Sequence, residues 1–110
     1  ERLIGKREIG MMKQGAVIIN TARGDVIDED ALVSALKSGH LHAAGLDVFQ
    51  DEPLPSQNEL MHLPNTVILP HIGSASHATR DRMSVMCAEN MIAALSGSNP
   101  PNLINPDCFA

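Results

Sequence analysis

The sequence predicts an α/β fold that consists of part of a doubly wound parallel sheet with a long C-terminal helix. Short, continuous apolar runs are typical of strands buried on both faces, and here they alternate with segments of helical periodicity. A strand–helix–strand unit with a right-handed crossover is half of a doubly wound domain. The 110 residues, of which 44% are hydrophobic, suffice for one small globular domain.

The first half of the chain predicts one strand between two helices. We expect a short helix over residues 7–13, which Gly15 ends, and a buried strand over residues 16–20. Asp28 is a good N-cap for the second helix, and Gly39 ends it. The apolar stripe of this helix consists of Ala31, Leu32, Ala35 and Leu36.

The second half predicts two further buried strands and a long helix. The strands cover residues 43–49 and 66–69, and the proline-rich segment between them is a surface connection with a helical turn over residues 59–63. Ser74 or Ser76 caps a helix that runs to about residue 95. Its apolar stripe suits core or interface packing and includes Met83, Met86, Cys87, Ile92 and Leu95.

Composition disfavours nucleic acid and membranes as partners. The net charge is −5, and no cluster of Lys and Arg is longer than Lys6-Arg7. No apolar run approaches the roughly 20 residues that a membrane-spanning helix needs. Cys87 and Cys108 fit no metal-ligand spacing, so we expect no metal site and two free thiols in a reducing compartment, the cytoplasm.

Charged side chains occur near the end of each predicted strand. Arg23 follows the first strand, Asp47 and Glu52 lie at the end of the second strand and beyond it, and His71 follows the third. Ligands bind beyond the carboxyl ends of parallel strands. We therefore expect a guanidinium, two carboxylates and an imidazole to meet at one edge of the sheet.

This combination of side chains can act on a small 2-oxo acid. A guanidinium holds a carboxylate in a bidentate fork, and a histidine gives or takes a proton near neutral pH. A carboxylate that bonds this histidine favours its protonated form. Taken alone, Arg23 would be a surface or capping charge, His71 a loop residue and Glu52 a solvated charge. Only their joint placement indicates a site that protonates a carbonyl oxygen as a hydride arrives.

Several motifs resemble, in order and spacing, those of the D-isomer-specific 2-hydroxyacid dehydrogenases. They are NTARGDVID at residues 20–28, AGLDVF at 44–49, DEP at 51–53 and LPHIGS at 69–74. Within the family, residues 67–75 and the Arg, Met and Ser that follow at 80, 83 and 84 resemble the glyoxylate/hydroxypyruvate reductases. The resemblance implies a Rossmann-type fold and hydride transfer between NAD or NADP and a small 2-oxo acid or D-2-hydroxy acid.

The resemblance also implies roles for the charged residues. Arg23 resembles the arginine that binds the substrate carboxylate, and His71 the proton donor in reduction and acceptor in oxidation. Glu52 resembles the acid that pairs with this histidine, and Asp47 the aspartate near the nicotinamide carboxamide. The implied catalytic set is therefore Arg23, Glu52 and His71.

Further residues are implied to contact cofactor or substrate. Thr21 and Ala22 resemble residues whose backbone lies against the nicotinamide ribose or ring. Gly73 and Ser74 lie where the loop after the histidine approaches cofactor and substrate. The cofactor set then comprises Thr21, Ala22, Arg23, Asp47, His71 and Gly73, and the substrate set Arg23, His71 and Ser74.

The chain lacks one part of such a domain. It contains no G-x-G-x-x-G turn, which seats a pyrophosphate at the start of a helix, and no following residue that would select NAD or NADP. It also begins without Met, so we expect residues 1–97 to be the carboxyl-terminal portion of a nucleotide-binding domain and residues 98–110 an extended tail. Such a piece alone is expected to be inactive.

Two related activities remain open at this stage. A dehydrogenase-like corepressor that senses nicotinamide nucleotide keeps the same Arg, Glu and His, although it carries a Trp after the His and this chain has no Trp. Phosphoglycerate dehydrogenase is the rival among the enzymes, but it usually continues into regulatory sequence. The family is usually dimeric, so a homodimer is the expected assembly.

Overall fold

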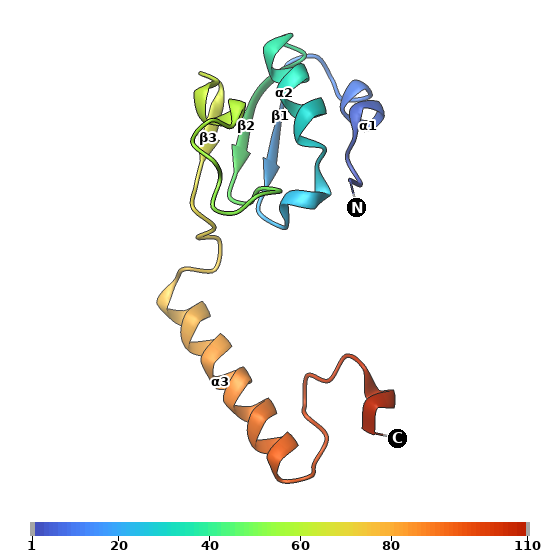
Figure 1. Ribbon diagram of the computed structural model, residues 1–110, viewed down its shortest axis with the longest axis vertical. Coiled ribbons are helices and arrows are strands. Elements are labelled where there is room, and N and C mark those ends of the chain that lie inside the picture. The colour runs from blue at the N-terminus through green and yellow to red at the C-terminus, as the bar shows by residue number, and fades with distance from the viewer. Residues whose placement is uncertain (1, 110) are drawn as a thin grey trace. The chain divides into compact units, whose positions relative to one another are not determined.

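The computed structural model of the protein describes residues 2–109, and the side chains of residues 2–107 (Figure 1). The chain divides into two compact units between Gly73 and Ser74, and each unit is described by itself. This division lies elsewhere than the expected boundary between residues 1–97 and 98–110, which stays a prediction.

The first unit contains a parallel sheet of three strands in the order β1-β2-β3. The strands are β1 (Ala16–Asn20), β2 (Leu41–Leu46) and β3 (Thr66–Ile68). This confirms the predicted parallel α/β fold, with corrections at strand ends. Strand β2 begins before residue 43 and ends at Leu46 rather than at residue 49, because the chain leaves the sheet at Asp47.

Helices α1 (Lys6–Gly10) and α2 (Glu29–Lys37) lie on the same side of the sheet (Figure 1). Asp28 caps α2 as predicted, since its carboxylate accepts the Ala31 N–H at 3.1 Å. Helix α1 is shorter than the predicted 7–13 and ends at Gly10, a poor helix former. Gly15, with φ of 80°, instead makes the turn into β1. Two short 3₁₀ helices are η1 (Gly24–Val26) and η2 (Glu59–His62), the latter as predicted.

The core of this unit lies between the two helices and one face of the sheet. Leu32 of α2 and Ile9 of α1 are 1% and 3% exposed, and they belong to the same apolar cluster as Ile18 of β1 and Leu46 of β2. Leu60 of η2 closes the cluster beyond β3 and is fully buried. The core is mainly aliphatic, with Phe49 as an aromatic member, and it joins both helices to the sheet.

Within the first unit, no described helix covers the opposite face of the sheet. Val17 and Ile19 of β1 and Val67 of β3 are exposed. The continuous apolar run in residues 16–20 predicted burial on both faces, and within this chain that prediction is wrong. The reason is that both helices of the unit pack against the same face.

The second unit consists of α3 (His77–Leu95), the short 3₁₀ helix η3 (Pro106–Phe109) and the segment that joins them. Ser76 caps α3 through its hydroxyl, which accepts the Thr79 N–H, and Gly97 follows the helix with φ of 74°. The segment turns back onto the helix through Asn90, whose amide bonds Asn102. Both ends of the predicted helix are confirmed.

The apolar stripe of α3 makes no buried core in the described part of the chain. Met83, Ile92 and Leu95 are all exposed. Cys87 is exposed and free, whereas the side chain of Cys108 lies outside the described residues. Among the described helices, none is both long enough and apolar enough to cross a membrane.

Truncation of the core should measure how far the first unit depends on α2. In the 110-residue chain, Leu32→Ala is expected to lower the free energy of unfolding by about 2–5 kcal/mol, because it leaves a cavity in a fully packed core. Urea denaturation followed by circular dichroism measures the change. Ser34→Ala, on the exposed side of the same helix, is the control, and an equal loss in both variants would contradict the described packing.

Candidate active site

The segment after β1 is held by a buried polar side chain. Asn20 is 5% exposed, and its amide accepts the Ala22 N–H at 3.1 Å and donates to the Arg23 carbonyl at 2.9 Å. The Arg23 side chain is exposed and donates to the Ala22 carbonyl at 2.6 Å. Asn20 thus fixes the backbone turn from which the guanidinium projects at the carboxyl edge of the sheet.

Gly24 lets this turn pack directly against the segment after β2. A Cβ atom at Gly24 would stand 1.9 Å from the carbonyl carbon of Phe49 and 2.0 Å from its oxygen. No side chain fits at that distance, so the glycine is a requirement of the close approach. The two strand exits therefore lie in contact.

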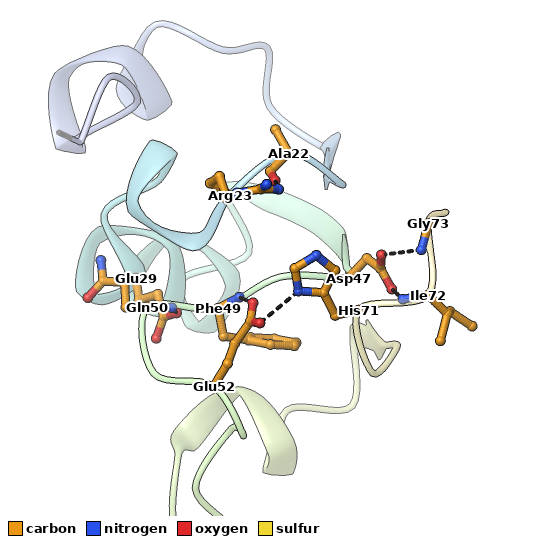
Figure 2. Close-up of polar contacts among 10 residues, drawn as sticks. All are labelled: Ala22, Arg23, Glu29, Asp47, Phe49, Gln50, Glu52, His71, Ile72 and Gly73. Atoms are coloured by element: carbon orange, nitrogen blue, oxygen red, sulfur yellow. Dashed lines mark hydrogen bonds and ion pairs between the residues drawn. The ribbon is translucent and has the colours of Figure 1, made fainter. Parts of the chain in front are cut away.

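Asp47 ties the exits of all three strands together. Its carboxylate, in a residue only 2% exposed, accepts the N–H groups of Ile72 at 2.8 Å and Gly73 at 2.7 Å (Figure 2). Its own N–H donates to the Asn20 carbonyl at 2.9 Å. The loop that follows β3 is thereby pinned over the end of β2.

Glu52 and His71 form a hydrogen-bonded pair at this edge. Glu52 Oε2 lies 2.7 Å from His71 Nδ1, and Glu52 Oε1 accepts the Phe49 N–H at 3.0 Å (Figure 2). The two side chains are 36% and 45% exposed, so a ligand can reach them. His71 has φ of 54°, a left-handed conformation that is uncommon outside glycine and that the Asp47 hydrogen bonds to the next two residues help to hold.

The surroundings of Glu52 lower the pKa of its carboxyl group. The hydrogen bond with His71 contributes most, followed by the hydrogen bond from the Phe49 backbone, and the charge of Arg23 adds to them. All of these favour the ionised carboxylate. A hollow with mainly apolar walls adjoins the pair and is lined by Phe49, Pro53, Leu54, Ile68, Leu69 and Pro70 as well as by the pair itself.

The structure brings most of the predicted site residues to one edge. Glu52 and His71 are in contact, Asp47 bonds the Gly73 backbone, and Arg23 is near enough for its charge to act on Glu52. Thr21 and Ala22 are exposed in the segment that follows β1. Ser74 begins the second unit, so its predicted role is not addressed by the geometry of the first. The chemical roles of all these residues stay predictions.

Two residues of the site were not identified from the sequence. Asn20 could have been noticed as a polar residue that ends an otherwise apolar strand. Glu29 lies in the first turn of α2, and its carboxylate accepts the Gln50 N–H at 2.7 Å. No local sequence pattern indicates this contact, because the two residues are 21 positions apart.

The chain is similar to known proteins over nearly its whole length. A family model described as D-isomer specific 2-hydroxyacid dehydrogenase, NAD binding domain, matches residues 1–73. Glyoxylate/hydroxypyruvate reductase B of Erwinia tasmaniensis is 55% identical over 104 residues, which cover 94% of this chain and 32% of that protein. The chain thus spans about a third of the length of the curated relatives it matches.

Solved structures agree in fold. A Thermus thermophilus protein matches with a TM-score of 0.85 and 51% identity over 94% of this chain and 33% of that one. An NADPH-dependent glyoxylate/hydroxypyruvate reductase of Sinorhizobium meliloti, solved with NADP and malonate, matches with a TM-score of 0.79 and 39% identity over 86% of this chain and 30% of that one.

Titration of Glu52 tests the pair directly. In the 110-residue chain, the carboxyl pKa measured by carbon NMR should lie below that of an ordinary glutamate, and His71→Ala should raise it part of the way back, since the Phe49 hydrogen bond remains. Because the pKa of Glu52 is lowered in the folded chain, its contacts stabilise the fold fully at pH values above the pKa of an ordinary glutamate. This stabilisation is lost as the pH falls through the lowered pKa. His42→Ala, an exposed histidine near the start of β2, should leave the pKa of Glu52 unchanged. An equal pKa of Glu52 in the unsubstituted chain and in His71→Ala would contradict the pairing.

Proposed function

Because this chain belongs to the D-isomer specific 2-hydroxyacid dehydrogenase family, we propose that it serves in an NAD(P)-dependent reductase of small 2-oxo acids such as glyoxylate or hydroxypyruvate. The observation that carries the proposal is the contact between Glu52 and His71 at the carboxyl edge of a parallel sheet. In a protein of the relatives' length, the chain supplies about a third of the residues, and these include the proposed proton donor.

Arg23 binds the substrate carboxylate in this proposal. Its guanidinium is exposed at the same edge as His71 and offers donors in a planar fork that matches a carboxylate. Binding at this point turns the 2-oxo group toward the imidazole. The positive charge also favours the anionic substrate over neutral carbonyl compounds.

His71 supplies the proton in the reducing direction. One ring nitrogen, Nδ1, is held by Glu52, so Nε2 is left to donate to the substrate's carbonyl oxygen. The Glu52 carboxylate stabilises the protonated ring before the transfer. In the oxidising direction the neutral ring takes the proton back from the hydroxyl group.

The edge fits part of a nicotinamide nucleotide. The segment with Thr21 and Ala22 is exposed at the carboxyl ends of parallel strands, where such ligands bind. Asp47 uses one lone pair on each oxygen for a backbone N–H, and a carboxylate retains further acceptor capacity for a carboxamide. When bound, the nicotinamide supplies or accepts the hydride. The proposed contacts of this chain are Thr21, Ala22, Arg23, Asp47, His71 and Gly73, with Ser74 on the substrate side.

The two alternatives are not favoured by the relatives. Those at 50–55% identity over 94% of the chain are glyoxylate/hydroxypyruvate reductases rather than corepressors or phosphoglycerate dehydrogenases. The reductase proposal therefore takes precedence over both.

We further propose a homodimer in the cytoplasm, with the small acid as its partner rather than nucleic acid or a membrane. The exposed apolar residues of α3, among them Met91 and Leu95, support an assembly, and the free thiol of Cys87 suits a reducing compartment. Sedimentation of the full-length protein as a monomer only, or its recovery outside the cytoplasm on cell fractionation, would contradict these assignments.

An initial-rate assay tests the proposed reaction. The full-length protein that carries this chain should oxidise NADH or NADPH with glyoxylate or hydroxypyruvate faster than with pyruvate or phosphohydroxypyruvate. His71→Ala should reduce kcat by roughly 10²-fold or more, because general acid catalysis contributes typically that much. Tight nucleotide binding without turnover of any of these acids would support the sensor instead.

The carboxylate role of Arg23 has its own test. Arg23→Lys is expected to raise KM for glyoxylate strongly, by an order of magnitude or more, because an ammonium cannot reproduce the bidentate fork. Arg7→Lys, an exposed arginine of α1, is the matched control. Wild-type kcat and KM in the Arg23 variant would mean that Arg23 does not bind the substrate carboxylate.

A further inference from the structure

The side chain of Glu29 links helix α2 to the segment that presents Glu52. Its Oε1 accepts the Gln50 N–H at 2.7 Å, and its Oε2 accepts from the Asn58 side-chain amide at 3.3 Å. Gln50 is held a second time, because its own amide donates to the Ile27 carbonyl at 3.2 Å. Figure 2 shows Gln50 beside Glu29, on the segment that leads to Glu52.

We propose that Glu29 is a positioning residue for the pair formed by Glu52 and His71. Glu52 lies in the segment between Gln50 and Asn58, and Glu29 holds both of these residues. Glu29 therefore determines where the Glu52 carboxylate stands relative to the imidazole, without touching either group. The consequence for catalysis rests on the proposed function, whereas the positioning itself does not.

Beyond Gln50 and Asn58, the segment from residue 50 to 58 is held where Leu54 packs against the apolar core and where the Ser56 carbonyl lies 2.9 Å from His62 Nε2. It carries Pro53 and Pro55, which donate no backbone N–H to a neighbour, and Asp51 and Glu52 are exposed at its tip. Its polar contacts with α2 run through the half-buried Glu29 carboxylate. Because a misplacement of about 1 Å can cost 10²-fold in rate, loss of the two Glu29 contacts is expected to lower activity.

A direct charge effect of Glu29 on Glu52 would have the opposite sign from positioning. An anion near Glu52 raises the carboxyl pKa by repulsion, so removal of that anion would lower the pKa. Loss of the anchor instead weakens the contact with His71, which is the main cause of the lowered Glu52 pKa, and so raises it. The direction of the change therefore separates the two mechanisms.

The first experiment follows the Glu52 carboxyl by carbon NMR in the 110-residue chain. Glu29→Ala should raise the pKa of Glu52 toward that of an ordinary glutamate. Glu29→Gln keeps an acceptor for the Gln50 N–H and should raise it less. Asp30→Ala removes an exposed acid from the next position of the same helix and should leave it unchanged. An unchanged or lowered pKa of Glu52 in Glu29→Ala overturns the proposal.

A second variant protects the test against loss of folding. If Glu29→Ala does not fold, Asn58→Ser is the alternative, because it removes the amide that donates to Glu29. The Asn58 side chain also accepts the Leu60 N–H at 2.9 Å, and a serine hydroxyl can replace that acceptor. A rise in the Glu52 pKa is again expected, smaller than for Glu29→Ala. No rise in this variant counts against the proposal equally.

The second experiment measures the consequence in the full-length protein. Glu29→Ala should lower kcat for 2-oxo acid reduction about tenfold with KM nearly unchanged, because the substrate carboxylate meets Arg23 rather than this anchor. The alkaline limb of the rate should move to lower pH in Glu29→Ala and in Glu52→Gln alike, because each change weakens the pair that Glu52 forms with His71. The double variant should show no further move. A loss of kcat without this shift of the alkaline limb would mean that Glu29 has only a structural role. If the unsubstituted protein shows no reductase activity, the proposed function fails, and the NMR result still decides the positioning.

Discussion

The buried carboxylate of Asp47 is the constraint on which the arrangement of the sheet's carboxyl edge depends. An ionised group removed from water costs several kcal/mol unless it finds hydrogen-bond donors. Asp47 finds two in the backbone of Ile72 and Gly73, and this requirement closes the loop after β3 over the end of β2. The neighbouring His71 is carried along with that loop and reaches Glu52. The hydrogen bonds of a buried carboxylate thus determine the position of a partly exposed histidine.

Three carboxylates near this edge differ in what surrounds them, and the difference decides what each can do. Asp47 is buried and bonds backbone N–H groups, which makes it a fixed support. Glu29 is half-buried and holds a loop by a backbone and a side-chain donor. Glu52 is partly exposed and divides its two oxygens between the Phe49 backbone and the imidazole. Of the three, Glu52 is the carboxylate that contacts the histidine.

Much of the first unit follows from local signals in the sequence. The cap at Asp28, the glycines at 39 and 97 and the apolar runs that became β1 and β3 each act within a few residues of the element they specify. The meeting of Arg23, Asp47, Glu52 and His71 at one edge also followed, because the carboxyl ends of parallel strands share an edge. The residue pattern and the parallel topology were sufficient to predict this arrangement.

The sequence by itself therefore determined the α/β class, the order of the elements and the edge on which the polar side chains gather. It did not determine that β2 ends at Leu46, that the described helices of the first unit leave one sheet face uncovered, or that Asp47 and Glu29 each hold a loop. The loop contacts join residues 21 to 29 positions apart, and the uncovered face depends on which face the helices cover. Local propensity and periodicity carry no information about such contacts, so the tertiary structure alone decided which carboxylates support the site and which one faces the histidine.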